Sequence, residues 1–421
     1  MFLPVHTNVD LPLIPAMGKD TIPVLAAIIG CWLIKNKKIK FFSNKGLLQL
    51  LVLLIFFGPF ITALLNNDRI FLANRFLPEL TFHDAISILI SQFLQISAFF
   101  LGKQFFRTYP DQLYMFRFLV MVGLIYSILM LFEIRMSPQL HRWVYGFFPH
   151  SFAQQIRGGG FRPVVFMGHG LWVAFFTVCV VVAASALTRI NEKIRNFPPS
   201  MVSYYLVVVL VLCKSKASLA YGVFAFVMIK IISVKNQMNA AVLLALLALS
   251  YPTLSIMNIF PHKQVIEVAE TLMGPERAES LVVRFDNEKI LLNHAKEKFF
   301  FGWGGWGRNR VYNKETGGNI TITDGRWVIT FGVYGMVGFI AEFGLLAISV
   351  VRARQAAKWL KNKKEHTLLS AHALLISLVM IDQLPNATLD PWLWLLSGIL
   401  LGRSEEIIAV RKKMSLTKVV H

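Results

Sequence analysis

The sequence predicts an all-α polytopic membrane protein, because of its composition and the spacing of its apolar runs. Of 421 residues, 55% are hydrophobic and only 16% are charged, against about 25% charged residues in soluble domains. The mean hydropathy is +0.57, and apolar runs of about 20 residues, the length that crosses a bilayer, recur along the chain. This composition excludes a soluble enzyme.

About eleven apolar segments, within a range of ten to twelve, are predicted to be transmembrane helices. Lys214 and Lys216 interrupt one long apolar stretch, and we predict a break there because two lysines at the bilayer centre would be costly. The predicted spans are 21–34, 46–65, 84–102, 113–132, 163–187, 199–213, 217–234, 240–260, 327–350, 367–384 and 390–402.

The net charge of +20, from 43 Lys and Arg against 23 Asp and Glu, would suggest nucleic acid in a soluble protein. Here the basic residues instead cluster in alternate links between apolar runs, which is the pattern of cytoplasmic loops. We therefore expect no nucleic-acid partner, a multi-pass topology, an N-terminus outside and a C-terminus in the cytoplasm.

This orientation places two sizeable segments, 133–162 and 261–326, on the outer face. They divide the chain into residues 1–260 with the first eight spans, the large extracytoplasmic loop 261–326, and residues 327–421 with the last three spans and a cytoplasmic tail. The long loop contains an apolar stripe at helical spacing, which predicts an amphipathic helix on the membrane, over a cavity or against the bundle. The stripe consists of Leu281, Phe285, Leu292, Ala295 and Phe299.

The first outer segment places three glycines between Arg157 and Arg162. Glycine amides and two guanidinium groups can hold a phosphate or diphosphate. A flexible turn and a contact with lipid headgroups are alternative interpretations. His169, which follows shortly, is interpreted either as a buried polar contact or as a contact to donor or acceptor.

The second outer segment carries Trp303 and Trp306, which either stack on sugars or anchor at the membrane interface. Arg308 and Arg310 follow this Gly and Trp loop, and Asp324 lies where the chain re-enters the membrane. The sequence has no metal-binding, Walker or serine-hydrolase motif. Cys31, Cys179 and Cys213 all lie in apolar runs, so no metal and no cofactor is expected.

The order of these features resembles the bacterial O-antigen ligase and polymerase superfamily. In that family a late extracytoplasmic loop carries a GxGxxxxxxxY segment, then a His-Asn pair with glycines eleven and fourteen residues after the His. GWGGWGRNRVY at 302–312 is similar to the first motif, and Gly335 and Gly338 fit the glycines. The family's His and Asn positions are occupied by Asp324 and Gly325, which are departures. KSKASLA at 214–220 resembles a family helix tip, with Lys216 in place of Arg.

This resemblance implies a GT-C-like glycosyltransferase architecture in the bacterial cytoplasmic (inner) membrane. It implies that an undecaprenyl-diphosphate-linked glycan donor and a glycan acceptor meet on the outer face, without a metal. Asp324 and Arg284, which stands where a loop arginine precedes the GxG segment, are the expected catalytic residues. The expected substrate-binding residues are Arg157, Arg162, His169, Lys216, Trp303, Trp306, Arg308 and Arg310.

Aspartate at the family's His position favours polymerisation of repeat units into O-antigen, capsule or exopolysaccharide. The alternatives are an O-antigen ligase acting in lipopolysaccharide assembly, a protein O-oligosaccharyltransferase and, in a different class, a transporter or lipid flippase. A chain-length regulator is a further candidate partner. Asp324 is expected to act as a general base, and the alternative is that it caps the next helix.

Overall fold

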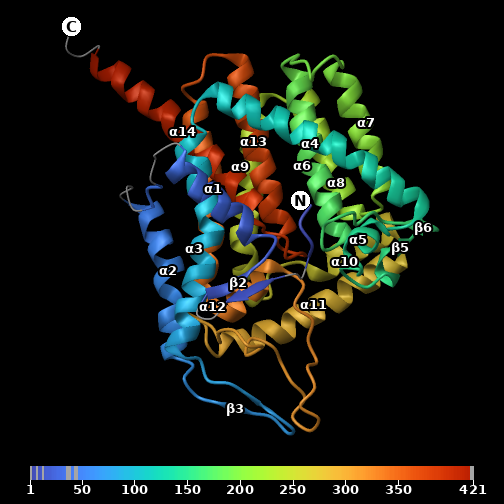
Figure 1. Cartoon of the computed structure of the whole chain (residues 1–421), viewed down its shortest axis with the longest axis vertical. Coiled ribbons are helices and arrows are strands. Elements are labelled where there is room, and N and C mark those ends of the chain that lie inside the picture. The colour runs from blue at the N-terminus through green and yellow to red at the C-terminus, as the bar shows by residue number, and fades with distance from the viewer. Residues whose placement is uncertain (1, 6–7, 12–13, 35–38, 42–45, 418–421) are drawn as a thin grey trace.

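The computed structural model describes residues 2–5, 8–11, 14–34, 39–41 and 46–417. Apolar helices stand side by side in one bundle (Figure 1), as expected for an all-α membrane protein. Within the described residues, seven helices are long and apolar enough to cross a membrane. They are α2 (Leu47–Leu64), α3 (Phe82–Phe105), α4 (Tyr109–Met136), α6 (Gly170–Arg189), α9 (Val234–Ile256), α12 (Arg326–Ala357) and α13 (Lys363–Asp382).

The four other predicted spans are also helical, but they are shorter or less apolar. α1 (Thr21–Leu33) and α7 (Pro199–Leu212) are apolar and short, and α8 (Lys216–Ile231) and α14 (Pro391–Thr417) complete the set. The predicted break before Lys216 is confirmed, because α7 ends at Leu212 and Lys214 has a φ of +52°. The count of eleven spans stays a prediction.

Helix α6 begins later than the predicted start at residue 163. The backbone amides of Val164 and Val165 donate to the buried Glu133 carboxylate of α4, at 2.8 and 2.7 Å. These bonds hold an irregular segment, and His169 then caps α6 at its first residue, Gly170. The prediction was wrong here because hydropathy does not show that these amides have a side-chain partner.

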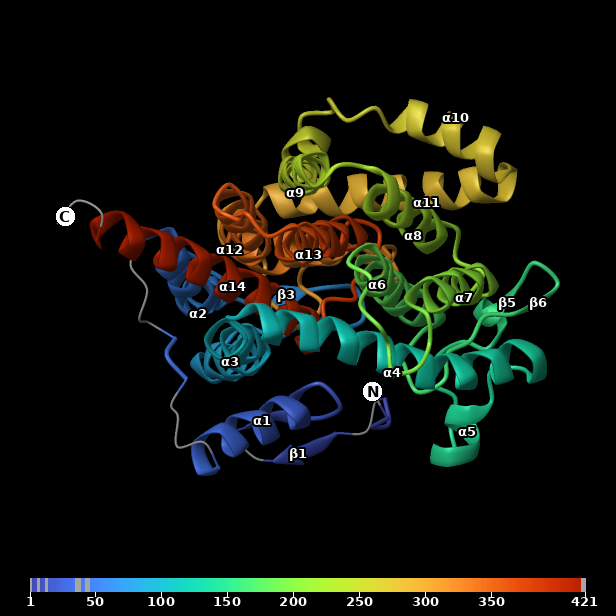
Figure 2. The ribbon, with the colours of Figure 1, turned by 90° about the horizontal axis from the view of Figure 1, so that it is seen from above.

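The centre of the bundle is formed by α6 and α13 (Figure 2). In these two helices 89% and 83% of the central residues are buried. Around them the remaining helices carry apolar side chains on their outer faces, among them Phe57, Phe118, Val208 and Leu243. Apolar residues on both faces are typical of a bundle that is surrounded by lipid.

Short elements gather at one end of the bundle. In the segment 261–326, α10 (His262–Met273) is followed by α11 (Pro275–Lys296), which crosses below the bundle (Figure 1). The predicted helix is confirmed for most of the apolar stripe: Leu292 and Ala295 are buried and Leu281 and Phe285 are half-buried, whereas Phe299 lies beyond the end of the helix. The other short elements are α5 (Leu140–Tyr145), a 3₁₀ turn (Ala153–Gln155) and three two-stranded sheets, β1 (Val9–Leu11) with β2 (Ile14–Met17), β3 (Ile70–Phe71) with β4 (Phe76–Leu77), and β5 (Ile156–Arg157) with β6 (Gly160–Phe161).

Helix α12 is broken at Gly335, whose φ of 68° and ψ of −169° are not helical. The segment that follows α11 inserts into this break and pairs with both helix ends. Gly302 and Gly335 touch there, and a Cβ on Gly335 would lie 2.3 Å from the Phe300 carbonyl. Only glycine fits such an approach at positive φ. The bonds run from Met336 N to Phe299 O, Val337 N to Phe300 O, Trp303 N to Gly332 O and Gly304 N to Val333 O, at 2.8–3.1 Å.

Candidate functional site

A cavity of about 890 Å³ lies where α11, the start of α6, the start of α12 and the α13–α14 connection meet the β5–β6 hairpin. Five of the residues predicted from the sequence line it, although they come from segments far apart in the chain. These residues are Arg157, Arg162, His169, Arg284 and Asp324. Three arginines face two carboxylates there, since Glu279 also lines the cavity.

The three glycines after Arg157 form the tight turn of the β5–β6 hairpin. Gly158 and Gly159 have φ values of +52° and +68°, as a two-residue hairpin turn requires. Lys214, from the break between α7 and α8, donates from Nζ to the carbonyls of Arg157 and Gly158, both at 3.1 Å. The glycines thus form a turn, and Lys214 fixes this turn against the bundle.

Arg162 is held more deeply than Arg157. Its side chain is buried, and one guanidinium nitrogen donates to the Lys214 carbonyl at 3.1 Å. The Nε of Arg157 is buried and has no hydrogen-bond partner among the described residues. A guanidinium that lines a cavity with an unused donor is suited to bind an anionic oxygen.

Arg284 of α11 forms an ion pair with Asp324 at the cavity wall, with Nε 3.4 Å from the carboxylate. A second nitrogen of Arg284 donates to the Pro385 carbonyl at 3.4 Å. The side chains are 33% and 46% exposed, so the pair is open to solvent and readily separated. The N-cap of α12 is Gly325, so the alternative that Asp324 itself caps this helix is wrong.

His169 caps α6 by accepting a hydrogen bond from the Leu171 amide on Nδ1, at 3.0 Å. Its Nε2 lies 3.4 Å from the Gln154 amide oxygen, so the ring carries its proton on Nε2. Burial lowers the pKa of His169 to about 4, and the nearby His150, Arg162 and Arg157 contribute in the same direction. His169 is therefore neutral at pH 7 and presents an N–H donor to the cavity.

A second cavity, of about 360 Å³ and mostly apolar, adjoins the first one. Arg284, Asp324 and Pro385 line both. Its walls come from the end of α9, α11 and the start of α12, and include Tyr251, Phe260, Phe285 and Trp327. Charged groups thus stand at the boundary between a polar and an apolar space.

Glu288, one turn after Arg284 on α11, ties this helix to α9. Its carboxylate accepts hydrogen bonds from the Tyr251 hydroxyl at 2.9 and 3.0 Å and from the Ser255 hydroxyl at 2.6 Å. Burial raises the pKa of Glu288, and the bond from Ser255 lowers it. Sequence analysis gave Glu288 no role and used Lys214 only to place a helix break, because their partners are distant in the chain.

The remaining predicted residues do not line the polar cavity. Lys216 is exposed at the start of α8, and Arg310 is exposed on the loop. The indole N–H of Trp306 donates to Asp84 at 3.0 Å, and Trp303 stacks on His294 with ring centroids 4.4 Å apart.

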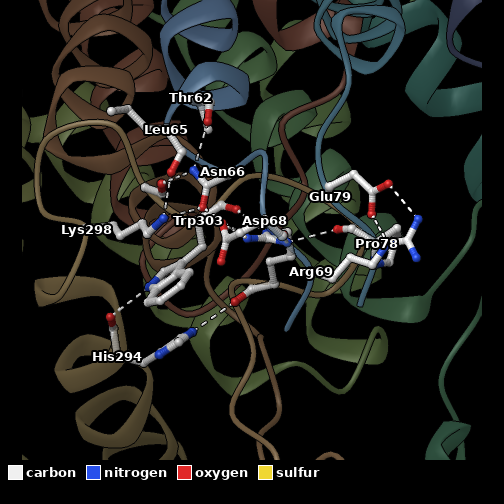
Figure 3. Close-up of polar contacts among 12 residues, drawn as sticks. Thr62, Leu65, Asn66, Asp68, Arg69, Pro78, Glu79, His294, Lys298 and Trp303 are labelled. Atoms are coloured by element: carbon white, nitrogen blue, oxygen red, sulfur yellow. Dashed lines mark hydrogen bonds and ion pairs between the residues drawn. The ribbon is translucent and has the colours of Figure 1, made fainter. Parts of the chain in front are cut away.

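Arg308 is fully buried, and the protein occupies all three of its guanidinium nitrogens. They donate to Trp303 O, Asp68 O, Pro78 O, Asn66 Oδ1 and Asp68 Oδ1, at 2.8–3.5 Å. Figure 3 shows Asn66, Asp68, Pro78, Lys298 and Trp303 gathered at this point. Lys298 also donates to Asn66, at 2.9 Å. This cluster joins the loop after α2 to the loop after α11.

Among the described residues, no group of three or more His, Cys, Asp or Glu side chains is arranged to hold a metal ion. Comparison of the sequence with protein-family models finds no match, and no curated protein matches it.

Proposed function

We propose that the protein is a membrane glycosyltransferase that polymerises undecaprenyl-diphosphate-linked repeat units on the outer face of the bacterial cytoplasmic membrane. One observation carries this proposal. Arg157, Arg162, Arg284 and Asp324, which come from three segments of the chain, line a single polar cavity. That cavity adjoins an apolar one at Arg284 and Asp324. This arrangement suits a substrate with an anionic headgroup and a long hydrocarbon chain.

In the proposed complex the donor diphosphate lies against the three arginines, and the prenyl chain enters the apolar cavity beside Arg284. Fixed guanidinium groups stabilise the negative charge that develops on the leaving diphosphate, which is the main electrostatic contribution available here. Arg284 exchanges its weak pairing with Asp324 for the phosphate oxygens. The Asp324 carboxylate is thereby released.

The free carboxylate then acts on the acceptor. As the acceptor oxygen forms a bond to the anomeric carbon, the bond from that carbon to the diphosphate oxygen breaks, and Asp324 takes the hydroxyl proton as general base. The products are the longer glycan and undecaprenyl diphosphate. His169 exchanges the long contact of its Nε2–H with Gln154 for a sugar or phosphate oxygen and serves as a binding residue.

Deletion of the gene, followed by analysis of surface and lipid-linked glycans, tests the class of function. We expect glycan that is limited to single repeat units, or no surface polymer, together with accumulation of lipid-linked single units. Full-length chains retained on undecaprenyl diphosphate would instead identify a ligase. Unchanged glycan with lost uptake of a solute would identify a transporter and overturn the proposal.

The reaction is tested directly with the purified protein, lipid-linked repeat units and no added metal. Longer lipid-linked chains and released undecaprenyl diphosphate are the expected products. If neither forms, and the protein instead transfers the glycan to a peptide or to a lipid A core, the polymerase assignment is overturned.

A further inference from the structure

A third cavity, of about 430 Å³, lies on the other side of the polar cavity. It is bounded by α4, α6, α14 and by Phe2, Lys19 and Asp20, which precede α1. Met115, Phe118 and Val122 of α4 line it at helical spacing, so the cavity follows one stripe of this membrane helix for about 10 Å. Phe118 is also exposed on the outside of the bundle. An elongated apolar cavity along a helix that faces lipid has the shape of a hydrocarbon chain.

The charges that line this cavity differ from those beside the donor site. They are Lys19, Asp20 and Asp390, one cation and two carboxylates. Lys19 donates to the Phe166 carbonyl, and its ammonium group keeps two further donors. Two carboxyl groups thus share the lining of this cavity with a single cation.

One cation beside two carboxyl groups is a poor site for a diphosphate and a better one for a headgroup that carries both a phosphate and an ammonium group. A polyprenyl diphosphate carries two or more negative charges and would face two carboxylates. A phosphate followed by a primary ammonium, in contrast, can place its phosphate on Lys19 and its ammonium between Asp20 and Asp390, with N–H donors for both. We propose that this cavity is a binding site for phosphatidylethanolamine, separate from the donor lipid site.

The proposed lipid site touches the polar cavity, because Trp172 and Thr388 line both spaces. A bound acyl chain supports one side of Trp172 while the other side faces the polar cavity. The inference itself does not depend on the proposed glycosyltransferase activity, and it is tested by lipid binding alone.

The test uses the full-length protein, purified in detergent and stripped of lipid, with phosphatidylethanolamine, phosphatidylcholine or phosphatidylglycerol of matched acyl chains added. Native mass spectrometry counts the bound lipid molecules, and the melting temperature of the protein reports how much they stabilise it. We expect phosphatidylethanolamine to bind about tenfold more tightly than phosphatidylglycerol, as one additional charge-assisted contact provides. Phosphatidylcholine should fall between them because its ammonium has charge but no N–H donor. Equal binding of all three would overturn the proposal.

Two variants and a control locate the site. Asp390→Asn should remove the preference for phosphatidylethanolamine, and Val122→Trp, which fills the apolar cavity, should remove the bound lipid. Arg284→Gln, in the donor site, should leave the preference unchanged. A preference that survives both Asp390→Asn and Val122→Trp overturns the assignment.

If either variant fails to fold, a photoactivatable phosphatidylethanolamine added to the wild-type protein locates the lipid-binding site. Cross-links in residues 115–122 are expected, and cross-links confined to other segments would contradict the site.

Discussion

Arg284 and Arg308 lie in the same segment, 261–326, and the family resemblance implies that both act on the substrate, yet the fold uses them differently. Arg284 is one third exposed, lines two cavities and has one weak ion pair, to Asp324. Arg308 is fully buried, and every guanidinium nitrogen donates to a protein oxygen. An arginine can bind a ligand only with donors that the protein leaves unused. The comparison therefore supports the proposed ligand binding by Arg284 and gives Arg308 a structural role.

The largest effect is expected at the partner of Arg284. Asp324→Asn keeps the size of the side chain but cannot accept a proton, and general-base assistance typically contributes about a hundredfold to ten-thousandfold in rate. We expect a correctly inserted protein that makes little polymer, measured with purified lipid-linked repeat units. Asp324→His should recover part of the activity, because an imidazole can also accept the proton.

Asp286→Asn is the matched control, since Asp286 lies exposed on α11 and does not line the polar cavity. Normal polymer from Asp324→Asn would show that no base acts at this position. It would then contradict the proposal that the Arg284–Asp324 pair belongs to the active site.

The structural role of Arg308 is tested by its effect on stability. Arg308→Met should lower the free energy of unfolding by about 2–4 kcal/mol, because a buried acceptor left without its donor costs about 1–3 kcal/mol. The carbonyls of Trp303, Asp68 and Pro78 would lose the hydrogen bonds that Arg308 donates, whereas Asn66 would keep the one from Lys298. Denaturation in mixed detergent micelles measures this change. Arg310→Met, on an exposed neighbour, should be nearly neutral.

The polymerisation rate per folded molecule distinguishes a structural role of Arg308 from a role in substrate binding. The Arg308→Met protein that does fold should polymerise at close to the normal rate. A loss of rate without a loss of stability would return Arg308 to the substrate site.

A smaller effect is expected from Arg284→Lys and Arg157→Lys. Lysine keeps the charge but loses the planar grip on two oxygens. Loss of one charge-assisted contact is typically worth about 1.5–3 kcal/mol, or about ten- to a hundredfold in rate. Stability should hardly change, because Arg284 is partly exposed. Arg310→Lys serves as the control, and equal rates for all three variants would remove the diphosphate clamp from the proposal.

Local patterns in the sequence predicted the parts of the fold that depend on local physics. The helix break before Lys216 follows from the cost of charge inside a bilayer, and the amphipathic helix over the cavity follows from the spacing of Leu292 and its apolar neighbours. The turn after Arg157 follows from consecutive glycines.

Features that depend on distant partners could not be predicted in this way. The burial of Arg308 depends on Asn66 and Asp68, more than 200 residues earlier. The break in α12 depends on Gly302, which fills the gap at Gly335. The late start of α6 depends on Glu133. A glycine or arginine in a motif looks the same in the sequence whether its neighbour is a ligand or the protein itself.

The smallest effect is expected at Trp306, which the sequence offers as a platform for stacking sugars. The structure places its indole N–H on Asp84, at the start of α3, and leaves 64% of the residue exposed. Trp306 also does not line the polar cavity. Trp306→Phe keeps an aromatic ring and removes one exposed hydrogen bond, so the free energy of unfolding should change by about 0.5 kcal/mol. Polymer length and the KM for lipid-linked repeat units should stay at wild-type values. A raised KM or shorter chains from Trp306→Phe would mean that the growing glycan passes over this loop. The loop that contains Trp306 and Arg308 would then belong to the substrate-binding part of the segment as well as to its structural part.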